Sequence, residues 1–179
     1  MNGGLNYLFL ALFVAIDLVL GVIITFVIVR VFTSMFIRGE GLDFLQEKNT
    51  AASVLLVAVI VSTALLCANT IMTVHQNLHL SAQIPAGART PYILQTIGLG
   101  FLQLILSVLI ALLIAFLSTK LFDVLTRGVD EYREIREKNN PAVGLLLAGI
   151  VVALTIYIRF PFSALVSSLI PLPQYNIPM

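Results

Sequence analysis

The chain has 179 residues, of which 59% are hydrophobic and 11% charged, and its formal net charge is +1. This apolar fraction exceeds what a soluble core of that size requires and predicts a polytopic membrane protein. The small net charge argues against a nucleic-acid partner, which would require an excess of basic residues. The lone cysteine, Cys67, supports neither a disulfide nor a thiolate metal site.

Four apolar runs reach the length of about 18 residues or more that crosses a bilayer. They cover residues 5–29, 50–72, 92–118 and 141–158. Hydrocarbon offers backbone amides no partners, so each run predicts a helix, and the fold class is an all-α membrane protein with four transmembrane helices. The sequence contains no glycine-rich phosphate loop, zinc-ligand spacing or nucleophile–base motif. We therefore expect no cofactor and no enzymatic activity.

The first run, residues 5–29, has no basic residue before it and predicts a retained helix, not a signal peptide. Asp17 lies thirteen residues before Arg30, or about 20 Å along a helix, near the middle of the bilayer. An ionised carboxylate is costly there, so Asp17 should be protonated, hydrogen-bonded or facing water. It would fix helix register, line a proton or ion path, or contact another subunit or lipid. Partners expected at similar depth are Ser62, Thr63, Gln103, Ser107 and Thr155.

Eight of the ten basic residues follow the first or the third predicted helix. They are Arg30, Arg38 and Lys48, and then Lys120, Arg127, Arg133, Arg136 and Lys138. Because basic loops stay in the cytoplasm, both termini are predicted to be non-cytoplasmic. Residues 30–48 also contain many apolar side chains, which predicts a cytoplasmic extension of the first helix followed by an interfacial segment.

The second and fourth runs each follow the same polar triplet. Glu47, Lys48 and Asn49 return ninety residues later as Glu137, Lys138 and Asn139. This spacing predicts two parallel-oriented helical-hairpin repeats, residues 1–72 and 92–160. Asn49 or Thr50 should cap the second helix, and Asn139 or Asn140 the fourth, whose first-turn position is occupied by Pro141.

Small residues stand one turn apart on the second and fourth helices. The pairs are Ala58 with Ser62, Ala64 with Ala68, Gly144 with Ala148, and Gly149 with Ala153. Such spacing allows close backbone approach between helices and favours packing within the chain over a dedicated dimer interface.

Residues 73–91 are predicted to form the outer loop. They include both histidines, His75 and His79, which on a continuing helix would face one side. The loop has no Cys, Asp or Glu as a third ligand, so the two histidines are only weak metal candidates. We expect them to be solvated or at headgroup level.

The segment Lys120 to Lys138 is predicted to be helical and amphipathic, with charges of opposite sign four residues apart. Its ionic face would be solvated, contact anionic lipid or dock a cytoplasmic partner. The docking candidates are Asp130, Arg133, Glu134 and Arg136. Beyond the fourth helix, four prolines exclude a fifth span, and residues 161–179 are expected to form an outer interfacial tail.

Thr126, Asp130, Glu134 and the run from Asn139 to Gly149 resemble the YjfL-like bacterial inner-membrane proteins, a family of unknown function. The shared motif is an acidic cytoplasmic segment, then Asn, small residues and an Ala-Gly pair. Val59 stands in the first half where Gly149 stands in the second. The resemblance implies two hairpins in a bacterial inner membrane and gene proximity to envelope-stress proteins. It implies no activity.

These patterns lead to two functional hypotheses. The first is a non-enzymatic inner-membrane scaffold or accessory subunit for envelope maintenance, whose cytoplasmic segments dock a protein partner. The alternative is a small ion or proton channel or transporter subunit that uses Asp17 with Gln103, Ser107 and Thr63. Four helices enclose little space, so the second hypothesis favours a homo-oligomer. The lipid bilayer is the partner in both.

Overall fold

The computed structural model describes residues 3–34, 48–81, 84–126 and 130–168. Its helices are α1 (Gly3–Phe32), α3 (Thr50–Ser81), α4 (Ala86–Leu125), α5 (Glu131–Arg136) and α6 (Pro141–Ser168). Within these ranges no strand occurs. Four of the helices are long and apolar enough to cross a membrane. The prediction of an all-helical protein with four membrane-spanning helices is thus confirmed in length and composition.

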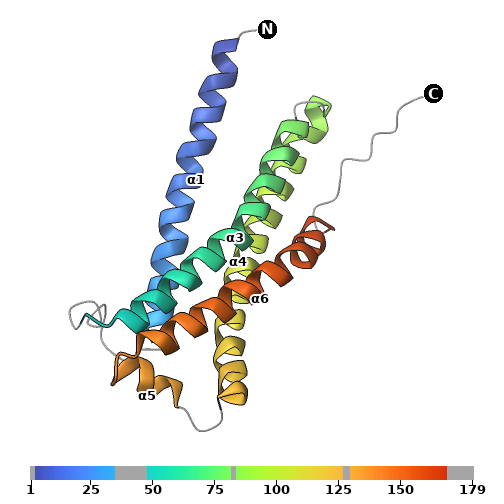
Figure 1. The fold of residues 1–179 in the computed structure, drawn as a ribbon. Coiled ribbons are helices and arrows are strands. Elements are labelled where there is room, and N and C mark those ends of the chain that lie inside the picture. The colour runs from blue at the N-terminus through green and yellow to red at the C-terminus, as the bar shows by residue number, and fades with distance from the viewer. Residues whose placement is uncertain (1–2, 35–47, 82–83, 127–129, 169–179) are drawn as a thin grey trace.

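The helix α3 lies at the centre of the bundle. In Figure 1, α1 and α4 run toward the end that carries α5, whereas α3 and α6 run back from it. The packing of α3 is most extensive with α6, then with α4, and least with α1. In the most apolar stretch of each helix, 56% of residues are buried for α3 but only 6% for α1. The first helix is therefore a peripheral element.

A glycine permits α3 and α6 to cross in close contact near their first turns. A Cβ atom at Gly144 would lie 2.6 Å from the carbonyl oxygen of Ala51 and 2.7 Å from its Cα atom. Ala148, one turn later, is also buried. By contrast, Gly149 has open space around it and Ala153 is exposed. The predicted close packing thus holds for one of the two small-residue pairs on α6.

The hydrophobic core joins α3, α4 and α6 and the end of α1 nearest α5. Its fully buried side chains include Phe32, Val59, Phe122, Leu147 and Val151. The outer surfaces of the long helices are also apolar, with large exposed side chains such as Leu18, Phe26, Val124 and Phe160. A surface so apolar suits lipid and not water.

The helices are longer than their apolar runs. α3 continues to Ser81 and α4 begins at Ala86, so most of the predicted loop 73–91 is helical. α6 likewise continues past Pro161 to Ser168, which makes the first residues of the predicted tail helical; residues 169–179 lie outside the described part of the chain. Hydropathy marks the bilayer crossing, whereas helical hydrogen bonding satisfies the backbone beyond the apolar run as well as within it.

The charged segment after the third span is divided. α4 ends at Leu125, α5 is a separate short helix, and residues 127–129 between them are not described. Asp130 begins α5 by accepting a hydrogen bond from the backbone N–H of Arg133. After the first span, α1 extends to Phe32; the interfacial segment predicted there falls largely on residues 35–47, outside the described residues.

Candidate functional site

Two groups of polar residues are candidates: the junction where α3, α5 and α6 meet, and a cavity beside Asp17. In the junction, Asn49 caps two helices at once. Its Oδ1 accepts the N–H of Ala52 at 2.9 Å, which satisfies a free amide in the first turn of α3. Its Nδ2 donates to the carbonyl of Ile135 at 2.8 Å, and lies 3.4 Å from that of Arg136, at the end of α5.

Asn139, the counterpart of Asn49 in the other triplet, caps a helix that is not its own. Its Oδ1 accepts the N–H of Ala51 in α3 at 3.1 Å, and its Nδ2 donates to the carbonyl of Lys48 at 3.2 Å. The side chain of Asn140 caps α6 instead, accepting the N–H of Ala142 at 3.2 Å. Both predicted triplets thus meet at the start of α3, where the two asparagines have different roles.

The backbone at this junction adopts an unusual turn in both triplets. Lys48 has φ 55° and Asn139 has φ 47°, the left-handed region that asparagine tolerates better than lysine. At Asn139, this conformation accompanies the cross-helix bonds to Ala51 and Lys48.

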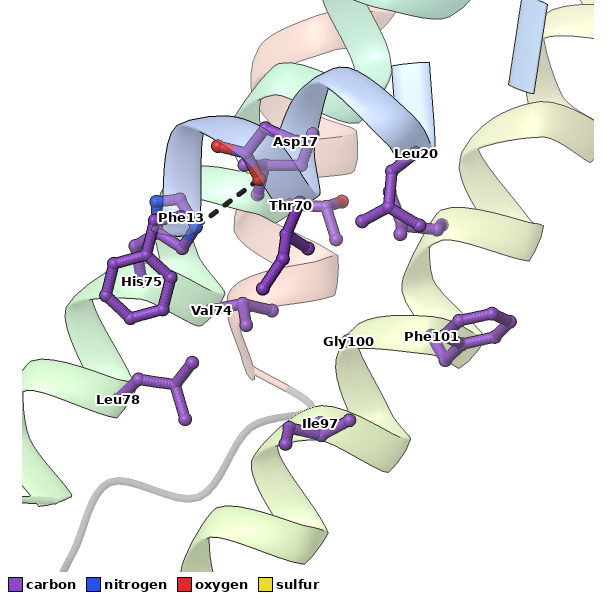
Figure 2. A pocket seen from close by; sticks show the side chains of 13 residues that line it. Phe13, Asp17, Leu20, Thr70, Val74, His75, Leu78, Ile97, Gly100 and Phe101 are labelled. Atoms are coloured by element: carbon purple, nitrogen blue, oxygen red, sulfur yellow. Dashed lines mark ion pairs between the residues drawn. The ribbon is translucent and has the colours of Figure 1, made fainter. Parts of the chain in front are cut away.

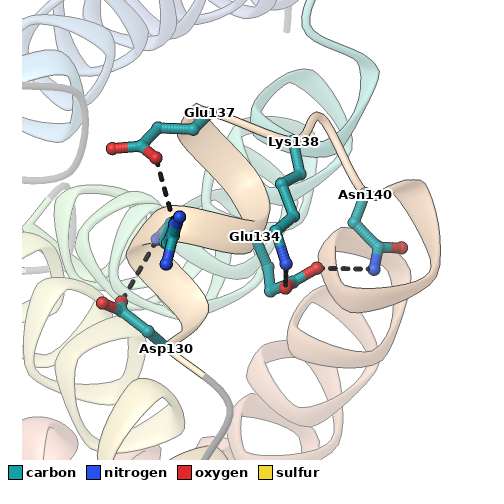
Figure 3. A network of polar contacts seen from close by, with 6 residues as sticks. Asp130, Glu134, Glu137, Lys138 and Asn140 are labelled. Atoms are coloured by element: carbon teal, nitrogen blue, oxygen red, sulfur yellow. Dashed lines mark hydrogen bonds and ion pairs between the residues drawn. The ribbon is translucent and has the colours of Figure 1, made fainter.

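The charged side chains of the predicted docking segment form local pairs on α5 and just after it (Figure 3). Arg133 Nε lies 3.3 Å from Glu137 Oε2, and both side chains are exposed. Lys138 and Asn140 both donate to the carboxylate of Glu134. The bond from Lys138 first, and that from Asn140 second, lower the pKa of Glu134 below its ordinary value. Arg136 is exposed.

Asp17 lies opposite His75, near the far end of α3 (Figure 2). His75 Nε2 is 3.4 Å from Asp17 Oδ1, an ion pair when the imidazole is protonated. One turn away on α1, the ring of Phe13 stands with its centroid 4.6 Å from that of His75 and 6.0 Å from that of His79. α1 therefore meets α3 here through an aromatic contact and a polar one.

The pair borders a largely apolar cavity of about 310 Å³ between α1, α3 and α4. Apart from Asp17, His75 and Thr70, its wall is formed by apolar side chains and one glycine. They include Ile16, Leu20, Val74, Phe101 and Leu104, with Gly100 between them. A cavity of this kind can hold a hydrocarbon group.

The side chains expected beside Asp17 have other partners. Gln103 Nε2 donates to the carbonyl of Val166 at 2.7 Å, one of the last four carbonyls of α6, which lack intrahelical partners. Ser107 donates to the carbonyl of Gln103 and lies 3.4 Å from Thr70.

Thr63 and Thr155 donate to carbonyls four residues back in their own helices. Ser62 is also buried, but its hydroxyl has no partner among the described residues. The structure thus pairs Asp17 with His75 and with none of the five side chains ranked by depth. These five lie within the bundle and do not line the cavity beside Asp17.

Sequence reasoning placed His75 in a loop and so missed its contact with Asp17. Two signals were available. The stretch 73–81 contains no Gly or Pro, and Phe13/Asp17 and His75/His79 are each four residues apart, which places each pair on one helix face. Among the described residues no group of three or more His, Cys, Asp or Glu side chains is arranged to hold a metal.

Comparison with known proteins identifies a likeness in the second half of the chain. Residues 96–172 match the family described as Domain of Unknown Function (DUF350), the family of the YjfL-like proteins. The match begins within α4 and passes the end of α6, so it includes α5 and the start of α6 but excludes Asn49, Asp17 and His75. No curated protein and no solved structure shows a significant match to the chain.

Proposed function

We propose that the protein is a non-enzymatic scaffold or accessory subunit of the bacterial inner membrane, which docks a partner protein on α5 during envelope maintenance. The observation that supports this function is the fixed position of α5. Its end is bound by Asn49 of the α3 cap, and its Glu134 is bound by Asn140 of the α6 cap. A helix of six residues is not stable alone, so these contacts hold it as a platform.

The outward side of this platform is ionic. Arg133, Arg136, Glu137 and Lys138 are exposed, and exposed charge at a fixed surface gives a partner orientation and specificity. The Arg133–Glu137 pair contributes little to stability because both side chains are solvated. Their arrangement is therefore available for recognition by a surface of complementary charge pattern.

The basic residues give the orientation of the platform. α5 lies at the end of the bundle where α3 and α6 begin (Figure 1). Arg30, Lys48, Arg136 and Lys138 belong to this end, which by the positive-inside rule faces the cytoplasm. Both termini then lie outside the cytoplasm, and the two helical pairs are parallel repeats of one hairpin.

Charge reversal tests the docking surface. In cells, proximity labelling from the tagged protein should lose its specific cytoplasmic neighbours in Arg133→Glu/Arg136→Glu, because the platform keeps its anchors but changes sign. Lys120→Glu, an exposed charge on α4 outside the platform, is the matched control and should retain them. An identical set of labelled neighbours for wild type and the double variant, at equal expression, contradicts the proposal.

A second candidate function is a proton or ion transport subunit, favoured by the Asp17–His75 pair. A carboxylate and an imidazole 3.4 Å apart within a membrane-spanning bundle can exchange a proton. Oligomers would be needed to form a path. In proteoliposomes, Asp17→Asn and His75→Gln should each abolish proton flux, whereas His79→Gln should retain it. Equal flux in wild type and Asp17→Asn argues against this function.

A further inference from the structure

We propose that the cavity between α1, α3 and α4 is a phospholipid site, which holds one acyl chain with its phosphate headgroup near Arg89 at the end of α4 remote from α5. The inference concerns a surface distinct from α5 and does not depend on the docking function proposed for that helix. It rests on the lining of the cavity, its opening, its size and the position of one arginine.

The lining admits hydrocarbon. Ile16 of α1, Val74 of α3, and Phe101 and Leu104 of α4 line the space. Val74 and Phe101 are labelled in Figure 2. Gly100 lets α3 and α4 approach closely at the cavity wall, because a Cβ atom there would lie 2.5 Å from Val74 Cγ2. An apolar chain that enters such a cavity gains contacts with a preformed wall.

The cavity opens sideways, where α1 and α4 diverge. Ile16, Ile97 and Phe101 line it and are 45%, 47% and 59% exposed. In a bilayer these exposed faces meet lipid tails. A chain can therefore enter from the membrane without crossing water, and it would fill the gap between α1 and α4, which are joined mainly through α3.

The size of the cavity and its apolar lining argue against two other occupants, a helix from a second copy and a phosphate group. A helix from a second copy is about 10–12 Å across, so a single turn occupies roughly 420–610 Å³, which is more than the 310 Å³ of the cavity. A phosphate inside the cavity would lose its hydration among mostly apolar side chains, which is costly for a charged group. The chain therefore lies inside and the headgroup outside.

Arg89 stands at the position that such a headgroup requires. It lies eleven residues before Gly100 on α4, which is about three turns and about 16 Å, so both residues lie on the same side of the helix. Arg89 is exposed, and its Nη2 donates to the carbonyl of Ile84 at 3.1 Å. A guanidinium at the membrane interface binds phosphate through charge-assisted hydrogen bonds.

Photo-crosslinking in nanodiscs tests the site with phosphatidylglycerol that carries a diazirine on its acyl chain. Crosslinks mapped by mass spectrometry should concentrate on residues 71–78 and 97–104. Gly100→Leu pushes Val74 and its own side chain into the cavity and should reduce them about tenfold, since the lost apolar burial amounts to about two methylene groups. Gly98→Leu is the matched control: nothing lies within 4 Å of a Cβ at Gly98, and the crosslinks should persist.

A second variant that blocks the cavity controls for misfolding caused by the substitution of Gly100. Val74→Phe fills the cavity from α3, and both variants are compared at equal helicity and elution volume. Crosslinks spread evenly over the lipid-facing helices, or unchanged in both folded blocking variants, would overturn the proposal. So would equal crosslinking by a diazirine alkane without a headgroup.

The headgroup is tested separately. At a limiting concentration of the phosphatidylglycerol probe, Arg89→Gln should lower the crosslink yield several-fold. The remaining crosslinks should still map to the residues that line the cavity. An unchanged yield would overturn the headgroup assignment. Charge reversal on α5 should leave all crosslinks in place, which separates failure of the docking function from failure of the lipid site.

Discussion

Asn49 and Asn139 each follow a Glu-Lys pair in sequence but make different hydrogen bonds in the fold. Asn49 caps its own helix and holds the end of α5, whereas Asn139 caps α3 from across the junction. The difference arises because α6 begins one residue later than its counterpart: Asn140 takes the capping position, and Asn139 turns toward Ala51. A side chain at an equivalent sequence position thus acquires a tertiary role.

The different capping roles predict which helix start Asn139 and Asn140 each protect from amide hydrogen exchange. Asn139→Ala should speed amide hydrogen exchange at the start of α3 and leave the start of α6 unchanged, whereas Asn140→Ala should do the reverse. Each lost cap should cost about 1 kcal/mol. Hydrogen exchange with mass spectrometry over residues 49–55 and 140–147 distinguishes them. Faster exchange of α6 in Asn139→Ala would contradict the cross-helix cap.

Glu134 makes the attachment of α5 dependent on pH. Its folded pKa lies below its ordinary value because Lys138 and Asn140 bind the carboxylate. The stabilisation is therefore fully present above the unfolded pKa and is lost as pH falls through the lower folded value. Proteolysis or exchange within α5 should rise in that acidic window for wild type. Glu134→Gln should show faster exchange at neutral pH and little further change on acidification.

At the scale of elements, the crossing of α3 and α6 determines the shape of the bundle. Gly144 brings the α6 backbone onto Ala51, and the buried face then continues through Leu147, Ala148 and Val151. α1 has no comparable approach. Its exposed side chains, such as Leu18 and Phe26, face outward, and it meets α3 at Asp17–His75 and at the end near Phe32.

Two glycines on α6 form a matched pair for testing this crossing. Gly144→Ala should destabilise the protein by about 1–3 kcal/mol, because its Cβ meets the Ala51 backbone, which cannot rotate away. Gly149→Ala has open space and should be neutral or stabilising by up to about 1 kcal/mol through helix propensity. Thermal unfolding in one detergent measures both. Equal unfolding temperatures for the two variants would contradict close α3–α6 packing.

At the scale of the whole molecule, the basic residues and the helix directions together predict one orientation in the membrane. In a Cys67→Ala background, a membrane-impermeant maleimide added to intact cells should label Gly87→Cys and not Arg136→Cys. Both positions are exposed. Gly87 is at the start of α4 and Arg136 at the end of α5, and these helix ends lie at opposite ends of the bundle (Figure 1). After permeabilisation both should react. Labelling of Arg136→Cys in intact cells would reverse the orientation and remove α5 from the cytoplasm.

The amino-acid sequence alone determined the helical class, the four apolar spans and the polar triplets that precede two of them. Hydropathy, backbone hydrogen bonding and local capping act within short stretches of chain. It also identified the charged segment around Glu134, since pairs four residues apart are local. The structure lengthened the helices, and α6 even passes Pro161, because helical hydrogen bonding does not require an apolar surface.

Only the tertiary structure decided that Asp17 contacts His75, that Gln103 caps the end of α6, and that Asn139 caps the start of α3. Each contact depends on how far a helix continues and at what angle it crosses its neighbour, and neither quantity is encoded at one position. The sequence analysis chose polar partners for Asp17 by their depth along each span, which assumes that the helix axes are parallel. Because α3 crosses the bundle obliquely, residues at equal sequence depth are separated, and a histidine near the end of one helix reaches an aspartate in the middle of another.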